Sequence, residues 1–412
     1  MTEAHIPAER ERIDVATASL SGTNLERAGD YNQRVVLQAI RINGPVTRAE
    51  LARMTGLTAP AIANITRRLI LDGLVADAGK RHGGRGQPAT KLIIHPDGCF
   101  ALGVTIDRDH VTTLVLDLLG HVRARTTHEG PLGSPEETAE RIRAMLAELM
   151  ALPVLTGARL IGLGVALPDA LGQTDLPDFR HQSAWAEVDL SRLFTEVARK
   201  LAPNGLPVFL ENDAAAAAVG ELQFGFGLQF SSFFYVLISA GLGGGLVVEG
   251  EYFRGANGRS GEIGFLPIHS AHTTARSLQE AVSLSALSAE LARHGVHISA
   301  PGELAQLDPS AREKVDQWLE LAAELLTEPL MTVAWLVNPA AILLGGRLPG
   351  DLTERLAERL TERLNQKSGQ SPVLPHVRRA AMAEDAPAIG AAILPFLAQL
   401  LPSRSNLLKI SD

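Results

Sequence analysis

Residues 238–264, ISAGLGGGLVVEGEYFRGANGRSGEIG, are the stretch that indicates most about the fold of the larger part of the chain. A β-rich run, Phe233 to Ser239, leads into it, so its glycines follow directly after a predicted strand. Glycines in this position can let backbone N–H groups approach a phosphate, but they suit a hairpin with a bulge equally well. The stretch ends with Glu262, and Glu280 follows further on; an isolated glutamate is usually solvated, so neither carboxylate indicates a site alone.

Glu211-Asn212-Asp213 lies upstream, between a predicted strand, Val208 to Leu210, and an alanine-rich helix, Ala214 to Leu222. Open α/β sheets bind ligands at the carboxyl ends of their strands, which makes Asn212 and Asp213 candidate binding residues. The same residue types are also ordinary helix N-caps, so both interpretations remain open here.

Predicted strands alternate with predicted helices from residue 100 onward, which is typical of an α/β fold. The expected strands include Phe100–Ile106, Val111–Asp117, Leu160–Ala166, Phe233–Ser239 and Ala341–Leu344. A turn at Leu118–His121 leads into one more strand, and a helix is expected at about residues 135–151.

The region before residue 95 has a different pattern, with short helices and turn signals. A helix is expected over Tyr31–Ile42, and a second over Arg48–Met54, where Thr47 and Glu50 have the spacing of a capping box. A third helix starts after Thr58, and the Gly-containing turn between the last two makes a helix-turn-helix. Its inward positions are expected to be Ile62, Ile65 and Leu69.

The third helix directs polar and small side chains outward, which suits a DNA major groove: asparagine pairs with adenine, alanine meets a thymine methyl, and arginine neutralises phosphate. The candidate DNA-binding residues on it are Thr58, Ala59, Ala61, Asn64, Arg67 and Arg68. Two strands around a basic, glycine-rich tip then form a wing, whose Arg81 and Arg85 are candidates for the minor groove. A three-helix unit alone can instead be a protein-docking module; the wing and the charge favour DNA.

Charge is divided unevenly along the 412 residues: the first 95 carry 13 basic and 9 acidic side chains, the rest 25 and 37. A basic head on an acidic body suggests a module that binds a polyanion. The charge distribution alone is explained equally well if the charged residues simply lie on solvated faces of helices. The chain length predicts two or three domains.

Several classes of protein are excluded by composition. One cysteine, Cys99, excludes an internal disulfide framework and a multi-cysteine zinc cluster. Residues 1–12 lack the apolar core of a signal peptide, and no apolar run is long enough to span a bilayer. We therefore expect a cytoplasmic protein that has no membrane partner.

Taken together, these residues resemble the ROK family of repressors, open reading frames and sugar kinases. Residues 238–264 resemble its signature, residues 208–221 its sugar-and-base motif, residues 343–346 the loop that faces adenosine in the kinases, and residues 388–392 its closing helix. The similarity extends from about residue 25 to 400 and includes the winged helix of the family's repressor branch. It implies an actin-like ATPase body of two ribonuclease-H-like lobes with a sugar cleft, in which Asn212, Asp213, Glu262 and Glu280 bind sugar hydroxyls.

The chain departs from the family's kinases at the phosphate loop. The kinases have Asp-x-Gly-Gly-Thr after the first strand, whereas this chain has Thr105-Ile106-Asp107-Arg108-Asp109. Bulky charged residues in place of both glycines keep backbone N–H groups away from a triphosphate, and the two aspartates repel it. Asp213 matches the family's general base, but without a positioned phosphoryl donor we expect no catalytic residue and no cofactor.

Two further departures concern the family's zinc site and sugar cleft. Phe265 stands where the family has a histidine, and no cysteine lies between it and Glu280; His269 and His272 without thiolates are a poor zinc site, so no metal is expected. Asp169 replaces a glycine of the family beside the sugar. Together with Phe265, it is expected to alter which ligand fits.

We therefore predict a DNA-binding transcriptional regulator, a repressor of carbohydrate genes, whose inactive kinase-like body binds a sugar or sugar derivative. Residues 1–29 are assigned to an arm, 30–97 to the winged helix-turn-helix, and 98–412 to the body. Its first lobe comprises about 98–211 with the C-terminal helix, and its second about 212–385. Its partners are a double-stranded operator, a small carbohydrate effector, and further copies in a homodimer or homotetramer. The alternatives are a sugar kinase with an added DNA module and a repressor controlled by protein docking.

Overall fold

The structure is a computed structural model and describes residues 25–80, 90–168, 182–202, 205–256, 258, 260–367, 369, 374–382 and 384–403. The chain divides into two compact units: a head of residues 1–93 together with 400–412, and a body of residues 94–399. Within the described residues, no helix has the length and apolar character needed to cross a membrane.

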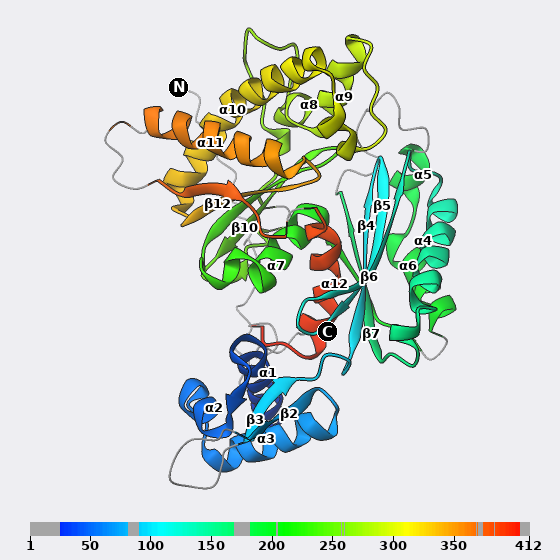
Figure 1. Cartoon of the computed structure of the whole chain (residues 1–412), viewed down its shortest axis with the longest axis vertical. Helices are drawn as coiled ribbons and strands as arrows, with labels where there is room; N and C mark the ends of the chain where they lie inside the picture. The colour runs from blue at the N-terminus through cyan, green and yellow to red at the C-terminus, as the bar shows by residue number, and fades with distance from the viewer. Residues whose placement is uncertain are drawn as a thin grey trace, which may run out of the picture. The chain divides into compact units, whose positions relative to one another are not determined.

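The head consists of three helices and a small sheet (Figure 1). Its elements are α1 (Leu25–Asn43), β1 (Val46–Thr47), α2 (Arg48–Thr55), α3 (Ala59–Leu71), β2 (Val75–Lys80) and β3 (Thr90–Ile94), with the strands in the order β1-β3-β2. Thr47 and Glu50 form the predicted capping box of α2. The Thr58 hydroxyl caps α3 by accepting a hydrogen bond from the Ala61 N–H at 3.5 Å. The predicted winged helix-turn-helix is confirmed.

Two details of the head differ from expectation. Helix α1 begins at Leu25, so the last residues assigned to the arm are helical. In α3, Thr66 is fully buried and Ile65 only partly, because Arg48 Nε donates a hydrogen bond to the Thr66 hydroxyl at 2.9 Å.

The chain returns to the head after it has completed the body. Residues 400–412 cluster with the head, and of these the structure describes residues 400–403. Leu401 is fully buried, and its carbonyl accepts a hydrogen bond from Arg34 Nη1 of α1 at 3.2 Å. The head is therefore built from two separate segments of the sequence.

The first lobe of the body contains a five-stranded sheet in the order β6-β5-β4-β7-β8. Its strands are β4 (Phe100–Asp107), β5 (His110–Asp117), β6 (Val122–Glu129), β7 (Leu160–Leu167) and β8 (Val208–Asn212). One face packs against α4 (Pro135–Met150), α5 (Gln182–Glu187) and α6 (Leu190–Leu201), and a short η1 (Pro153–Leu155) precedes β7. Leu102, Val104 and Ile106 of β4 point to this face, so Thr105 and Asp107 point to the other.

The second lobe contains the other five-stranded sheet, in the order β11-β10-β9-β12-β13. Its strands are β9 (Phe233–Ile238), β10 (Leu242–Val248), β11 (Glu251–Tyr252), β12 (Ala341–Gly346) and β13 (His376–Arg379). The helices on its outer face are α8 (Leu278–Ala281), α9 (Leu284–Arg293), α10 (Pro309–Val337) and α11 (Gly350–Lys367). The short helices η2 (Phe226–Leu228), η3 (Ile263–Phe265) and η4 (Pro301–Gln306) complete the lobe.

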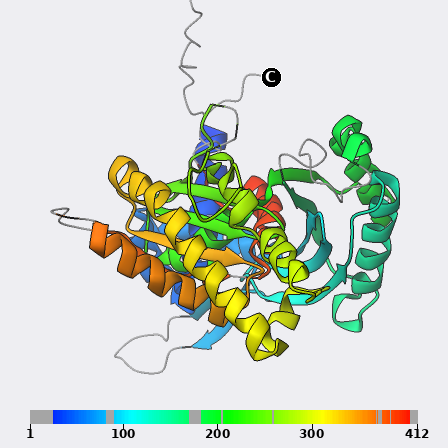
Figure 2. The same cartoon turned by 90° about the horizontal axis from the view of Figure 1, so that it is seen from above.

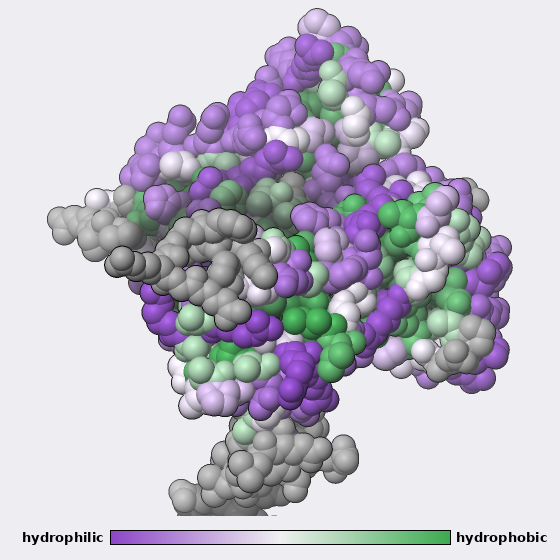
Figure 3. Space-filling view, turned by 60° about the horizontal axis from the view of Figure 1, so that its bottom comes forward, coloured by the Kyte–Doolittle hydropathy of each residue, from purple (hydrophilic) through white to green (hydrophobic). Residues whose placement is uncertain are grey.

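Helices α10 and α11 lie side by side in Figure 2 and are joined by surface ion pairs, among them Arg359 with Glu320 and Lys367 with Glu328. Such pairs between exposed side chains contribute little each, so the apolar core beneath the two helices holds them on the sheet. Figure 3 shows hydrophilic residues over most of the face of the body that is drawn there.

Two helices, α7 (Asp213–Phe224) and α12 (Ala386–Gln399), form the layer between the sheets (Figure 1). Helix α12 lies against β4, β7 and α7. Gly390 allows this close crossing: a Cβ there would lie 3.0 Å from Ala216 Cα and closer still to the Ala216 carbonyl oxygen. The body is therefore an α/β/α/β/α stack of two lobes, and the predicted fold class is confirmed.

The glycine-rich run after β9 forms strand β10. It pairs antiparallel with β9, and Gly245 lies over α7, where a Cβ would come 2.7 Å from the Ala218 Cβ. The structure therefore has the hairpin that was one of the two interpretations of these glycines, and small side chains on both sides let the sheet and α7 approach.

Candidate functional site

Helix α3 presents the predicted DNA-reading residues on its outer side. Thr58, Ala59, Asn64, Arg67 and Arg68 are exposed, and Ala61 is partly buried. Arg67 Nη2 donates a hydrogen bond to Asn64 Oδ1 at 3.0 Å, so the two side chains adjoin on one surface. The predicted wing residues Arg81 and Arg85 lie outside the described residues.

A cavity of about 420 Å³, including its open mouth, lies between the two lobes of the body. We call it the interlobe cavity; it is lined by Arg108, Pro168, Asn212, Asp213, Leu237, Ser239, Gly241, Leu242, Gly243, Glu262, Phe265 and Gln279. Three of the four residues predicted to bind sugar hydroxyls, Asn212, Asp213 and Glu262, therefore meet at one cavity. Asp169, which was expected nearby, lies outside the described residues.

Glu280 is not part of this cavity. Its side chain is exposed, and its Oε2 accepts a hydrogen bond from the Arg276 N–H at 2.8 Å. The preceding residue, Gln279, lines the cavity instead. Successive residues of a helix differ by about 100° in direction, so when Leu278 and Ala281 of α8 enter the core, Gln279 and Glu280 face different ways. The family resemblance indicates a carboxylate at this point of the chain, whereas the side chain at the cavity is the amide of Gln279.

Asn212 and Asp213 reach the cavity from the junction of β8 and α7. Asn212 Oδ1 caps α7 by accepting a hydrogen bond from the Ala215 N–H at 2.9 Å, and Asp213 Oδ1 accepts one from the Ala214 N–H at 2.7 Å. The capping and binding interpretations are thus compatible, since both side chains also border the cavity.

The acidity of Asp213 is altered by its surroundings. Burial raises its pKa to about 7, and the charges of Asp107 and Glu262 add to this rise. The Ala214 N–H and the charge of Arg108 oppose it. Near neutral pH, the Asp213 carboxyl is therefore divided between a protonated form that donates a hydrogen bond and a charged form that only accepts.

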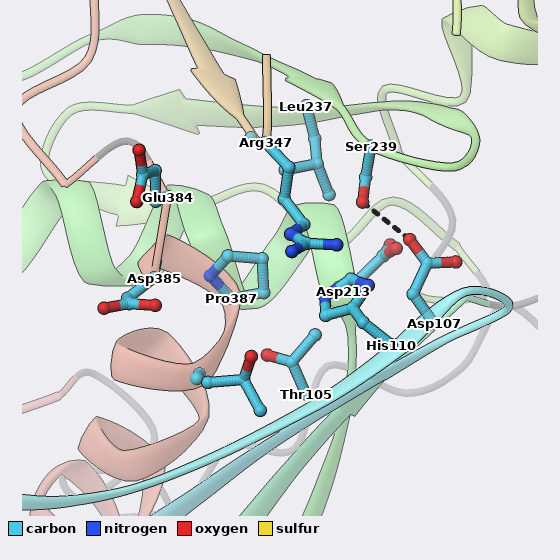
Figure 4. A pocket seen from close by; sticks show the side chains of 13 residues that line it. Thr105, Asp107, His110, Asp213, Leu237, Ser239, Arg347, Glu384, Asp385 and Pro387 are labelled. Atoms are coloured by element: carbon cyan, nitrogen blue, oxygen red, sulfur yellow. Dashed lines mark hydrogen bonds between the residues drawn. The ribbon is translucent and has the colours of Figure 1, made fainter. Parts of the chain in front are cut away.

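A second, smaller cavity adjoins Asp213 at the β4–β5 hairpin, and Figure 4 shows its lining side chains; we call it the hairpin cavity. Here Ser239 Oγ donates a hydrogen bond to Asp107 Oδ2 at 2.6 Å, from the second lobe to the first. Arg347, at the end of β12, pairs with Glu129 and lies 4.0 Å from Asp109. Burial raises the pKa of Asp109, but its hydrogen bond with His110 and the charges of His110 and Arg347 outweigh burial and lower it.

The residues of the hairpin cavity do not fit a nucleoside triphosphate. Asp107 occupies the place of a kinase glycine, and its carboxylate is already bonded across the lobes to Ser239. In the described part of the chain, Asp107, Asp109 and His110 are the one trio of ligand-type residues whose atoms lie within 4.8 Å of one another. Arg108 and Arg347 supply positive charge beside this trio, and the Asp109–His110 bond uses two of its ligand atoms.

The family's zinc site is not reproduced either. Phe265, in the histidine's place, is 52% exposed at the cavity, and the single thiol, Cys99, is buried next to the start of β4. His272 Nδ1 lies 3.3 Å from Glu324 Oε2 on the surface. One exposed imidazole beside one carboxylate is not a structural zinc site.

Known proteins share both parts of this chain. Residues 101–396 match the ROK family, and residues 30–76 match a winged helix-turn-helix DNA-binding domain. The uncharacterized protein y4fQ of Sinorhizobium fredii is 30% identical over 79% of this chain and 80% of its own length. The xylose repressor of Bacillus spizizenii is 28% identical over 58% of this chain and 60% of its own length, so the match spans about three fifths of that repressor.

A solved structure supports the same architecture. The crystal structure of a ROK family transcriptional regulator, a homolog of the Escherichia coli Mlc protein, matches 90% of this chain and 96% of its own, with a TM-score of 0.65 and 22% identity. Fold and comparisons together define a two-lobed ROK-type body with a winged helix-turn-helix head. The chain belongs to the ROK family, as its motifs indicated.

Proposed function

We propose that this protein is a cytoplasmic DNA-binding repressor of carbohydrate genes, and that its body binds a sugar or sugar derivative without phosphorylating it. The observation that carries the proposal is that one chain combines two features. Helix α3 has an exposed face with polar and basic side chains, and the kinase-like body has Asp107 and Arg108 in place of the two glycines of a phosphate loop. The relatives named as repressors support the regulatory role.

The DNA contact is assigned to Thr58, Ala59, Ala61, Asn64, Arg67 and Arg68 on α3, with Arg81 and Arg85 from the wing. Two such heads in a homodimer or homotetramer would read the two halves of a palindromic operator, about one helical turn apart. Light scattering coupled to gel filtration measures the oligomer; a monomer that binds DNA at full affinity contradicts this part of the proposal.

The reading face can be tested on the full-length protein with a duplex selected from random sequences. Asn64→Ala is expected to cost about 1–3 kcal/mol and to relax the preference at one base pair, because asparagine recognises adenine in the major groove. Arg67→Ala is expected to weaken all duplexes alike and to reduce the salt dependence by about one unit, because it loses a phosphate contact. Fluorescence anisotropy over a salt series measures both.

Arg199→Ala is the control, because Arg199 is an exposed arginine of the body that pairs with Glu196. It is expected to leave DNA affinity unchanged. If it weakens binding as much as Arg67→Ala does, the effect is one of net charge and α3 is not the reading helix.

The body is expected to show no sugar kinase activity. A coupled assay with ATP, magnesium and a panel of hexoses and pentoses should stay at background, because Asp107 and Arg108 fill the place where backbone N–H groups would bind phosphate. Turnover above background that disappears in Asp213→Asn would instead support the kinase alternative, since Asp213 matches the family's base.

The ligand contact is assigned to Asn212, Asp213 and Glu262, joined by Gln279, which lines the same cavity as they do. Oxygen atoms of carboxylates and amides accept hydrogen bonds from sugar hydroxyls, and charged acceptors bind them most strongly. A thermal-shift screen against sugars tests this, since a ligand that binds only the folded state raises the melting temperature.

A further inference from the structure

Arg108 reaches into the interlobe cavity from the turn between β4 and β5. Its side chain is 11% exposed. It extends from the first lobe to the β9–β10 turn of the second, because a Cβ built on Gly241 would lie 2.9 Å from Arg108 Nη1. The guanidinium therefore borders the same space as Asp213 and Glu262.

The guanidinium is poorly compensated for a group so deeply buried. Its one ion-pair partner among the described residues is Asp107, whose Oδ1 lies 3.7 Å from Nη1, beyond hydrogen-bond distance. Within the same residues, its Nε has no hydrogen-bond partner. Asp107 is itself engaged: Oδ1 accepts from the Arg108 backbone N–H at 2.8 Å, and Oδ2 accepts from Ser239.

A buried N–H group without a hydrogen-bond partner, such as the Nε of Arg108, is costly, and a ligand that supplies an anionic acceptor removes that cost. Guanidinium is suited to this task because its parallel N–H groups match a carboxylate or a phosphate in a bidentate arrangement.

We propose that the ligand of the interlobe cavity is an acidic sugar, whose carboxylate or phosphate group is bound by Arg108 while its hydroxyl groups are bound by Asn212, Glu262 and Gln279. This inference rests on the proposed sugar-binding function and specifies its ligand class. Arg108 is then the residue that determines specificity between acidic and neutral sugars.

The carboxyls around the cavity set the pH dependence of this binding. Asp213 faces Asp107 and Arg108 from the hairpin and Glu262 from the second lobe, and its pKa is about 7. An anionic group beside Asp213 favours the protonated carboxyl, which no longer repels it and can donate a hydrogen bond. Affinity for an acidic sugar therefore falls as pH rises through about 7, whereas a neutral sugar whose hydroxyl donates to Asp213 binds better as pH rises.

The experiment compares matched ligands on the full-length protein by calorimetry. Each neutral hexose of a panel is paired with its uronate and with its 6-phosphate, at about pH 6 and about pH 8. For at least one hexose, one acidic form is expected to bind about tenfold or more tightly than the neutral parent. The uronate, whose charge is the same at both pH values, is expected to bind more tightly at the lower pH. The uronate and phosphate arms show which anionic group is recognised.

Three variants assign the effect to Arg108. Arg108→Gln is expected to remove the preference for the acidic form over its neutral parent. Arg108→Lys keeps the positive charge but loses the bidentate N–H groups, so it is expected to retain part of that preference. Arg143→Gln, at a partly exposed arginine of α4 that pairs with Glu140, removes the same charge and is expected to leave the affinity for every sugar unchanged. Melting curves of each variant without ligand establish that it is folded.

The outcomes separate this inference from the proposed function. If a neutral sugar binds as tightly as its acidic forms and Arg108→Gln has no effect, the inference is wrong and the sugar-binding function stands. If no sugar of any kind binds, the proposed function itself fails.

Discussion

Gly390→Ala is expected to destabilise the protein by about 3 kcal/mol or more, among the largest losses for a single methyl group. Gly390 lies in α12 where it crosses α7, and an added Cβ would overlap the Ala216 carbonyl oxygen and come 3.0 Å from Ala216 Cα. Both obstructing atoms belong to the backbone of a buried helix, so no side-chain rotation relieves the overlap. The two helices of the middle layer would have to separate, which opens a void between the sheets.

Urea denaturation of the full-length variant measures this loss. Gly302→Ala is the matched control, because nothing lies within 4 Å of a Cβ at that position in η4. Its free energy of unfolding is expected to stay within about 0.5 kcal/mol of the original. Equal stability of the two variants would show that α12 does not cross α7 as closely as described.

Glu221→Ala is expected to cost about 3–5 kcal/mol. The Glu221 side chain is fully buried in α7, and it accepts three backbone hydrogen bonds: Oε1 from Phe226 N–H at 2.9 Å and Ala381 N–H at 3.0 Å, and Oε2 from Met382 N–H at 2.9 Å. Truncation leaves these three donors buried without an acceptor and also opens a cavity.

Glu221→Gln separates the loss of hydrogen-bond acceptors from the opening of a cavity, because glutamine keeps one acceptor oxygen and nearly the same volume. We expect its free energy of unfolding to fall by less than that of the alanine variant. Glu148→Ala, at an exposed glutamate of α4, is the control and should change the free energy of unfolding by less than about 0.5 kcal/mol. A Glu221→Ala protein as stable as this control would refute the structural role of Glu221.

Capping residues in the sequence predicted where α2 and α3 of the head begin, but no such signal marked the start of α1. Thr47, Glu50 and Thr58 mark helix starts by side-chain chemistry that is independent of the rest of the fold, and the structure has caps at these residues. The start of α1 at Leu25 was missed because Gly29 and Asp30 are weak helix formers. Thr66 is buried although it is polar, because Arg48, 18 residues earlier, donates a hydrogen bond to its hydroxyl. The hydrophobic periodicity of α3 alone does not reveal this contact.

In the body, the sequence predicted the main strands and the junction that carries Asn212 and Asp213. It offered no expectation for α10, whose 29 residues contain Pro329, a residue disfavoured inside helices. It placed Glu280 in the cavity where Gln279 lies, because only the packing of Leu278 sets the rotation of α8. The sequence indicated that Arg108 obstructs a phosphate loop. It could not indicate that the guanidinium lines the cavity, because that depends on how the two lobes pack against each other.

The return of the chain to the head has a consequence for how the two units are connected. The chain passes between the head and the body twice, once at Ile93–Ile94 and once at Gln399–Leu400. The second connection follows directly from α12, the helix held between the two sheets, and two residues later Leu401 is bonded to α1 through Arg34. The end of α12 and the described residues of the head's second segment, 400–403, are therefore consecutive in the chain.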